Sequence, residues 1–383
     1  MENQIETRGL QPLLVYATGS ALGPGSRTHG YMRYLCDWDS HHAPSVLILR
    51  SGASPVLLVP NLFMAFLAER YFWMRDVRFV KISDFPREVA ALLKQSNLAK
   101  GRAGLVGRNE MPAPVWEGLK DWLPDVDWED FTHALDERRV IKDRLQMSLH
   151  ERAAEICDDL FITLAREIRT PKPGFQLQAD MERTARCAGC EYCITWLTVL
   201  PKADYPRYFK EECQRVPQLG DQVIAGVSLI YEGHWGHAVR SGTFGAPNEG
   251  QRKVFDIALE MEETMLGLLK PGTDLFDLQE AAEKIVFKHY PDADERKIIR
   301  ARHGHGLGLS YEDPISSLPF PQVYDKSLRG KPTSFEVKVG MLFEFHPNLF
   351  VPNVAGAMIG DMVTVTTHGA RILNRFPREL IRW

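Results

Sequence analysis

The stretch that decides the fold runs from Gly220 to Phe244 and reads GDQVIAGVSLIYEGHWGHAVRSGTF. Its first half, Gln222 to Ile230, is rich in valine and isoleucine, and the pair Glu232-Gly233 supplies a two-residue turn. His234 and His237 follow on the returning strand. The pattern predicts a β-hairpin whose second strand carries side chains suited to chemistry.

Length and composition limit what this hairpin can belong to. The chain has 383 residues, which suggests about two domains. A formal net charge of −4 and a sequence pI near 6.3 give no general attraction to nucleic acid or to a membrane surface, so we expect a small-molecule substrate and neither of those partners. No apolar run reaches the roughly 20 residues of a membrane span, and the polar opening MENQIETRG lacks the pattern of a signal peptide. We therefore expect a cytoplasmic protein with reduced cysteines.

The order of the predicted elements divides the chain in two. Residues 1–138 alternate apolar strand-like runs with helical segments, which predicts an N-terminal α/β domain. Residues 139–383 begin with a long amphipathic helix from Arg139 to Glu167 and contain another from Asn248 to Leu269. The remainder has the alternation and the glycine-containing turns of antiparallel strands. We therefore predict an α+β C-terminal domain.

Four segments, in this order, resemble the signature segments of one protein family. They are RRVIKD from Arg138, LKPGTD from Leu269, HGHGLGLSYEDP from His303 and GMLFEFHPNLF from Gly340. The chain resembles the creatinase, prolidase and aminopeptidase P family (M24) over essentially its whole length. The resemblance implies a catalytic domain with the pita-bread fold, preceded by a smaller creatinase-like α/β domain.

The same resemblance locates the positions that hold two metal ions in the peptidases of the family, where the ligands are two aspartates, a histidine and two glutamates. In this sequence the five positions hold Gly226, His237, His305, His346 and Gly360. Four of the five ligands differ, and glycine has no side chain to bind a metal. A dinuclear site needs carboxylates that hold two cations close together. The sequence therefore predicts no dinuclear centre and a divergent, non-peptidase member of the family.

Two interpretations of His237, His305 and His346 stay open at this point. Three neutral imidazoles are sufficient ligands for one zinc, iron or manganese ion. Alternatively, the histidines act without metal as acid, base and substrate anchor, because imidazole changes its charge near neutral pH. Glu344 precedes His346 by two residues and therefore lies on the same strand face. We expect it to transfer a proton or to orient an imidazole.

Further residues are candidates for substrate binding. Arg207 and Tyr208 lie about where the family places a substrate-binding histidine, and these residue types indicate recognition of an anionic or aromatic group. The loop from Arg27 to His42 is dense in aromatic and basic side chains, and in dimeric relatives the matching loop reaches the partner's pocket. We therefore predict a homodimer in which Trp38 helps to complete the site. His234 and Glu312 are the remaining candidates.

Taken together, these residues predict an enzyme that is not a peptidase. The leading hypothesis is a hydrolase that cleaves, or eliminates at, a C–N bond of a small polar metabolite, with one metal ion or none at the three histidines. One alternative is an iron enzyme that uses oxygen at the same histidines. The other is a pita-bread binding module without activity.

Overall fold

The computed structural model describes residues 10–204, 214–300, 303–313 and 335–383. The chain divides into two compact units. The first contains residues 1–139 and 309–311, and the second contains residues 140–308 and 312–383. No helix in the described ranges combines the length and the apolar character that crossing a bilayer requires.

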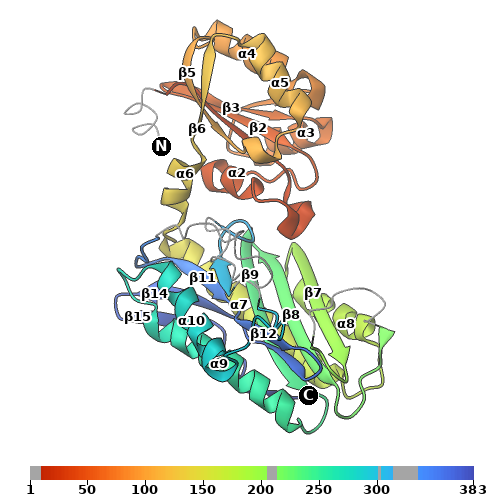
Figure 1. Ribbon diagram of the computed structural model, residues 1–383. Coiled ribbons are helices and arrows are strands. Elements are labelled where there is room, and N and C mark those ends of the chain that lie inside the picture. The colour runs from red at the N-terminus through yellow and green to blue at the C-terminus, as the bar shows by residue number, and fades with distance from the viewer. Residues whose placement is uncertain (1–9, 205–213, 301–302, 314–334) are drawn as a thin grey trace. The chain divides into compact units, whose positions relative to one another are not determined.

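A six-stranded mixed sheet is the centre of the N-terminal unit (Figure 1). Its strand order is β4-β3-β2-β1-β5-β6, with antiparallel pairs among β1, β2 and β3 and parallel pairs elsewhere. All five residues of β1, LLVYA, are buried, which is typical of a strand covered on both faces. The strands are β1 (Leu13–Ala17), β2 (Ser45–Arg50), β3 (Ala53–Val59), β4 (Asp76–Phe79), β5 (Gly101–Val106) and β6 (Val126–Asp130). The helices are α2 (His29–Cys36), α3 (Leu62–Tyr71), α4 (Phe85–Gln95), α5 (Ala113–Trp122) and α6 (Thr132–Arg139), with short 3-10 helices at Ser20–Gly25, Ile82–Asp84 and Arg108–Glu110.

A half-buried carboxylate holds the loop that follows β1. Glu110 accepts hydrogen bonds from the hydroxyls of Thr18, Ser26 and Thr28 at 2.8, 2.8 and 2.7 Å and from the backbone N–H of Arg27 at 2.8 Å. Burial raises the pKa of Glu110, but these hydrogen bonds outweigh burial and hold the pKa below its ordinary value. An ionised side chain therefore fixes this loop to the segment after β5.

Two four-stranded sheets and a hairpin form the C-terminal unit (Figure 1). The first sheet has the order β16-β9-β8-β7, and the second has the order β10-β11-β14-β15. A backbone bridge joins them, because the N–H of Val239 donates to the carbonyl of Gly360 at 3.0 Å and the N–H of Gly360 donates to the carbonyl of Val239 at 2.9 Å. The strands are β7 (Tyr192–Leu200), β8 (Gln222–Tyr231), β9 (His234–Thr243), β10 (Gly304–Gly306), β11 (Leu342–Phe345), β12 (Asn348–Val351), β13 (Ala355–Met358), β14 (Asp361–Thr366), β15 (Gly369–Ile372) and β16 (Ile381–Arg382).

The hairpin expected between residues 220 and 244 is present as β8 and β9. Ser228 pairs with His237 across the two strands. The turn residues Glu232 and Gly233 have φ angles of 48° and 75°, the left-handed pair that a two-residue turn of this kind requires. The turn therefore fixes the register in which β9 presents His237.

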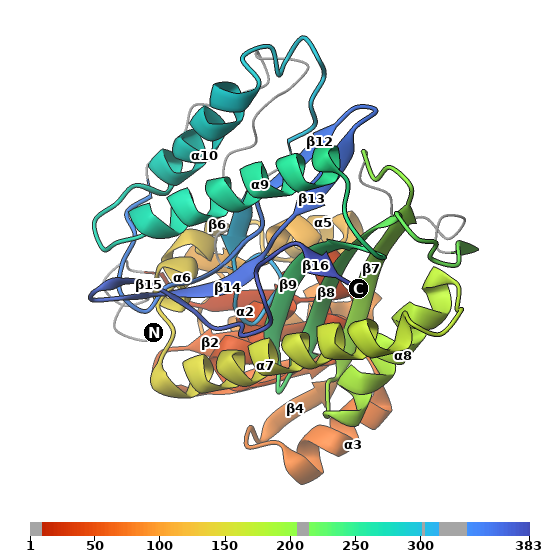
Figure 2. The ribbon, with the colours of Figure 1, turned by 90° about the horizontal axis from the view of Figure 1, so that it is seen from below.

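Helices pack against these sheets. α7 (Arg144–Glu167) lies along β8 and β9, and α9 (Glu249–Leu268) lies along the β12–β13 hairpin (Figure 2). The helix expected to begin at Arg139 begins instead at Arg144, because Asp143 caps it. The Asp143 side chain accepts from the N–H of Gln146 at 2.9 Å, and the Gln146 side chain accepts from the N–H of Asp143 at 3.1 Å. The other helices are α8 (Gly174–Cys187) and α10 (Leu275–His289).

Candidate active site

Four side chains of the C-terminal unit converge on one point. His237 is on β9, His305 on β10 and Glu344 on β11, and His346 directly follows β11. His305 is the register partner of Glu344, and the Val239–Gly360 bridge brings β9 to the same sheet. One potential ligand atom from each of the four side chains lies within 4.8 Å of the others. We call His237, His305, Glu344 and His346 the four-residue group.

The imidazole rings of this group are compact and buried. The ring centroids are 5.5 Å apart for His237 and His305, 5.6 Å for His237 and His346, and 5.3 Å for His305 and His346. None of the four residues is more than 6% exposed. Polar groups so deeply buried need hydrogen bonds, protons or a cation to offset the loss of water.

Glu344 supplies part of that compensation. Its Oε2 atom accepts a hydrogen bond from Nδ1 of His346 and lies 3.2 Å from Nδ1 of His237. Burial raises the pKa of Glu344, but the charges and hydrogen bonds of His237 and His346 outweigh burial and hold the pKa well below its ordinary value. The site therefore contains an ionised carboxylate at neutral pH.

The surroundings of His305 favour a cation at the site. Nδ1–H of His305 donates to the carbonyl of Gly306 at 2.8 Å. Burial, the largest cause, holds the pKa of His305 well below its ordinary value, so the ring is neutral. Nε2 then carries a lone pair and faces Oε2 of Glu344 at 3.7 Å. These two electron-rich atoms repel each other, whereas a divalent cation near both would attract both.

The donor set fits one divalent cation. Three imidazole nitrogens and a carboxylate suit zinc, iron or manganese. In addition, Oε1 of Glu344 is buried and has no hydrogen-bond partner among the residues that the structure describes. A cation held by this group would satisfy an oxygen that the protein itself leaves unused.

His234, a candidate from the sequence, lies away from this group. Residues three apart on a strand point to opposite faces, so His234 and His237 face different sides of β9. The ring of His234 lies 5.0 Å from that of His150 on α7. His150 is fully buried, and its Nδ1–H donates to the carbonyl of Trp235 at 2.9 Å. The two histidines form a separate pair between α7 and β9.

Two of the other candidates from the sequence are among the described residues, and neither is a member of the group. Glu312 is half-buried in a turn and is not one of the four convergent residues. Trp38 belongs to the N-terminal unit, where its Nε1–H donates to Oγ of Ser45 at 3.2 Å and its ring packs on Phe72 with centroids 5.1 Å apart. Arg207 and Tyr208 lie outside the described residues.

Trp196, which the sequence did not single out, borders the group, and Arg240 holds the backbone of Gly360. The indole of Trp196, on β7, meets the ring of His237 edge to face with centroids 5.7 Å apart. Arg240, on β9, is 1% exposed and donates to the carbonyl of Gly360 at 2.7 Å and to Oδ1 of Asp361 at 2.7 Å. The register between β7 and β8 sets Trp196 beside His237, and a single sequence contains no signal for that register. Arg240 gives no local signal either, because its burial and its pairing with Asp361, at a sequence separation of 121, depend on packing.

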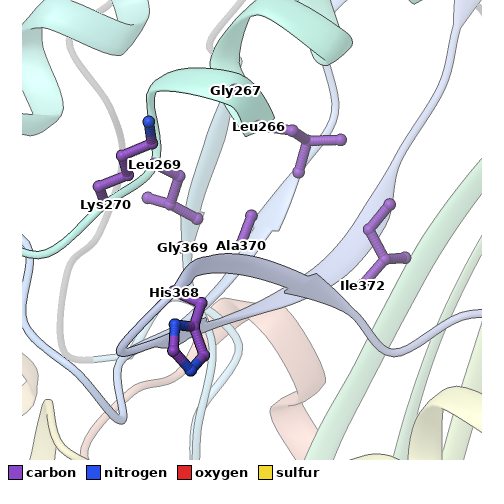
Figure 3. A pocket seen from close by; sticks show the side chains of 8 residues that line it. All are labelled: Leu266, Gly267, Leu269, Lys270, His368, Gly369, Ala370 and Ile372. Atoms are coloured by element: carbon purple, nitrogen blue, oxygen red, sulfur yellow. The ribbon is translucent and has the colours of Figure 1, made fainter.

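A shallow hollow of about 360 Å³ lies elsewhere in the C-terminal unit, between the end of α9 and β15 (Figure 3). Its lining combines aliphatic side chains with Lys270 and His368. None of its eight lining residues belongs to the four-residue group. The hollow is therefore separate from the site of the proposed chemistry.

The comparison with known families identifies the class of protein. The model of Metallopeptidase family M24 matches residues 148–367, which is more than half of the chain and includes the whole four-residue group. The chain belongs to this family. As an M24 protein it is an enzyme of the hydrolase class.

Individual M24 relatives are similar over most of their length. The Xaa-Pro dipeptidase of Pyrococcus furiosus is 26% identical over 336 residues, which cover 87% of this chain and 88% of that protein. The Xaa-Pro dipeptidase of Pyrococcus horikoshii is 23% identical over 337 residues, with the same coverage. Among solved structures, the prolidase from Pyrococcus horikoshii is similar with a TM-score of 0.79 at 21% sequence identity. The superposition covers 99% of this chain and 98% of the prolidase chain. The expected α+β pita-bread architecture with a smaller N-terminal domain is confirmed.

The expectation of a non-peptidase enzyme acting on a small polar metabolite is wrong. The relatives are Xaa-Pro dipeptidases, and the same finding counts against the oxygen-using iron enzyme and the inactive binding module. The error was to equate the loss of carboxylate ligands with the loss of peptidase chemistry. A single zinc ion held by two imidazoles and one carboxylate is sufficient in other peptidases.

Proposed function

We propose that this M24 protein hydrolyses the C–N amide bond of a small dipeptide-like substrate at the four-residue group, with one bound divalent cation. The observation that carries the proposal is the convergence of three buried imidazoles and an ionised carboxylate within 4.8 Å. Xaa-Pro dipeptides are the first substrates to test, because several relatives bear the name Xaa-Pro dipeptidase.

Two glycines support a single cation rather than a pair. Gly226 on β8 and Gly360 before β14 flank the group and contribute no side chain to it. A pair of cations needs ligands that reach both of them. Among the described residues, the three imidazoles of the group are sufficient to hold one cation with a position left open for substrate, and Glu344 is the only carboxylate of the group.

The roles of the residues follow from their protonation. The neutral His305 and its two neighbours would hold the cation, which would polarise the carbonyl oxygen of the amide. Glu344, as a carboxylate, takes a proton from the attacking water while the water oxygen forms a bond to the carbonyl carbon. The C–N bond then breaks, and Glu344 returns the proton to the leaving nitrogen. The products are a carboxylic acid and an amine, and no electrons are gained or lost.

The test uses the purified full chain, stripped of metal by a chelator and reloaded with zinc, iron(II) or manganese. Release of free proline from Xaa-Pro dipeptides is measured beside release of amino acids from dipeptides without proline. We expect His305→Ala to lower kcat/KM by about a hundredfold or more. His368→Ala, the same exchange at an exposed histidine, should change it by less than about twofold. Absence of hydrolysis in every reloaded sample, or equal activity in the two variants, refutes the proposal.

We also propose a homodimer in which a second copy covers α3. The helix and the segment after it expose five aromatic side chains by between 47% and 77% of their area: Phe63, Phe66, Tyr71, Trp73 and Phe79. A fully exposed aromatic side chain offers about 200 Å², so the exposed fractions of these five add up to roughly 600 Å². Leu62 and Leu67, each about half exposed, bring the total near the ~800 Å² that each partner contributes to a standard interface. Sedimentation should show a wild-type dimer and a monomeric Phe63→Glu/Phe66→Glu variant. A monomeric wild type at micromolar concentration contradicts this proposal.

A further inference from the structure

Gly360 lies beside the four-residue group, and its backbone is firmly held. It pairs with Val239 of β9 through two backbone hydrogen bonds, and its carbonyl also accepts from Nη1 of Arg240 at 2.7 Å. Gly360 is not among the glycines with positive φ. Its backbone conformation therefore accepts an ordinary side chain, and the space around it decides whether one fits.

That space is occupied by Glu344. A Cβ atom at position 360 would lie 2.4 Å from Oε1 of Glu344, 3.0 Å from Cβ of His346 and 3.2 Å from Cβ of Val239. Non-bonded carbon atoms prefer separations of about 3.5–4.0 Å, so the first contact forces Glu344 to move, whereas the other two need small adjustments. A side chain at position 360 and the carboxylate of Glu344 therefore compete for one volume.

Only one of the two oxygens of the carboxylate that occupies this volume has polar partners in the described part of the protein. Oε2 of Glu344 contacts His346 and His237, whereas Oε1 is buried without a hydrogen-bond partner in the described part of the chain. Negative charge beside the imidazoles is what the group gains from Glu344. The same charge could reach this volume from position 360, because β14 is the direct neighbour of β11 in the sheet.

Position 226, which pairs with Val239 from β8 as Gly360 does from the other edge of β9, is different. A Cβ atom at Gly226 would lie 3.1 Å from Cε3 of Trp196 and 3.8 Å from Cγ2 of Val239. Trp196 is the register partner of Gly226, and its indole edge lies against His237. A side chain at position 226 would therefore press against an aromatic ring, which does not bind a divalent cation as a ligand.

We propose that positions 344 and 360 are exchangeable sources of the one carboxylate that the four-residue group requires. The site accepts a glutamate at either position but not at both, and it accepts no acid at position 226 while Trp196 is present. The part of this inference that concerns cation binding rests on the proposed function. The competition for volume does not.

A double-mutant cycle tests the exchange by thermal unfolding of the metal-free chain. Gly360→Glu in the wild-type background should lower Tm, because two carboxylates then share one volume and repel each other. In the Glu344→Ala background the same substitution should lower Tm by less than half as much. Gly360→Ala in both backgrounds is the matched control, since it adds the Cβ atom without the charge. Equal Tm losses from Gly360→Glu in the two backgrounds overturn the proposal.

Calorimetric titration with zinc then tests the exchange of function. Glu344→Ala should bind zinc about 10–100-fold more weakly than the wild type. Glu344→Ala/Gly360→Glu should recover most of that loss, and Glu344→Ala/Gly360→Ala should recover none. If the two double variants bind zinc equally weakly while the wild type binds it well, the exchange is refuted and the proposed function stands. A wild type that binds no zinc, iron(II) or manganese refutes the proposed function, and the unfolding cycle still decides the exchange.

Discussion

Replacing Arg240 by methionine should remove much of the stability of the C-terminal unit. The guanidinium of Arg240 pairs with Asp361 at 2.7 Å. It also donates to the carbonyls of Gly360, Pro377, Phe376 and Val239 at 2.7, 2.9, 3.0 and 2.9 Å. Methionine fills similar space but takes a donor from four carbonyls. Among the described residues it leaves Arg378 to offset the charges of both Asp361 and Glu262. Breaking a buried ion pair from one side costs about 3–5 kcal/mol. At about 2–4 °C per kcal/mol for a domain of this size, Tm should fall by about 6–20 °C in a calorimetric scan.

A matched control separates this effect from the loss of any arginine. Arg152 on α7 pairs with Glu155 at 3.0 Å, but its side chain is 44% exposed, so Arg152→Met should cost less than about 1 kcal/mol. Asp361→Asn in the Arg240→Met background should restore part of the stability, because Arg378 then offsets the charge of Glu262 alone rather than those of Glu262 and Asp361 together. If Arg240→Met and Arg152→Met lower Tm equally, the reasoning about the buried pair is wrong.

Three further predictions concern His150, Glu110 and Gly226. Burial holds the pKa of His150 well below its ordinary value, so only the unfolded chain gains a proton at this residue as pH falls below about 6.5. The free energy of unfolding, measured in urea, should therefore drop by about 1 kcal/mol between pH 7 and 5.5. His150→Gln should make this dependence on pH weaker. The pKa of Glu110 is lowered in the folded state, so the contribution of its charge to the free energy of unfolding is complete above the pKa of the unfolded state and is lost as pH falls through the pKa of the folded state. Glu110→Gln should therefore lower the free energy of unfolding by about 2 kcal/mol at pH 7. A difference between the two proteins that is unchanged at pH 3 would contradict this. Gly226→Asp should lower Tm because the new side chain meets the Trp196 indole 3.1 Å from its Cβ, and zinc titration should still give one site; a second site would contradict it.

The sequence selected residues that converge in the structure, but it did not predict their surroundings. Resemblance to the M24 family selected His237, His305 and His346, and strand alternation placed Glu344 on the face of His346. The alternation also separates His234 from His237, as the contact of His234 with His150 bears out. These relations depend on neighbours along the chain or on segments that the family shares.

What could not be predicted depends on contacts between strands that are distant in sequence. The register that sets Trp196 opposite Gly226 joins β7 and β8 across a long connection, and no local pattern fixes such a register. The approach of Glu344 to Gly360 likewise depends on packing between β11 and β14. In contrast, the later start of α7 was readable, because an Asp three residues before a Gln is a capping pattern. Asp143 and Gln146 form that pattern here.

The bridge between Val239 and Gly360 has a consequence for the rate at which a cation could enter or leave. His237 belongs to one sheet, whereas His305 and Glu344 belong to the other. The four-residue group therefore spans the junction between the two sheets, which we call the seam, and the two backbone hydrogen bonds between Val239 and Gly360 hold this seam closed. Opening the seam separates His237 from its partners without unfolding either sheet. Cation dissociation and hydrogen exchange at the amides of Val239 and Gly360 should therefore have a common opening step, so that the seam, rather than the strength of the ligands, sets the residence time of the ion.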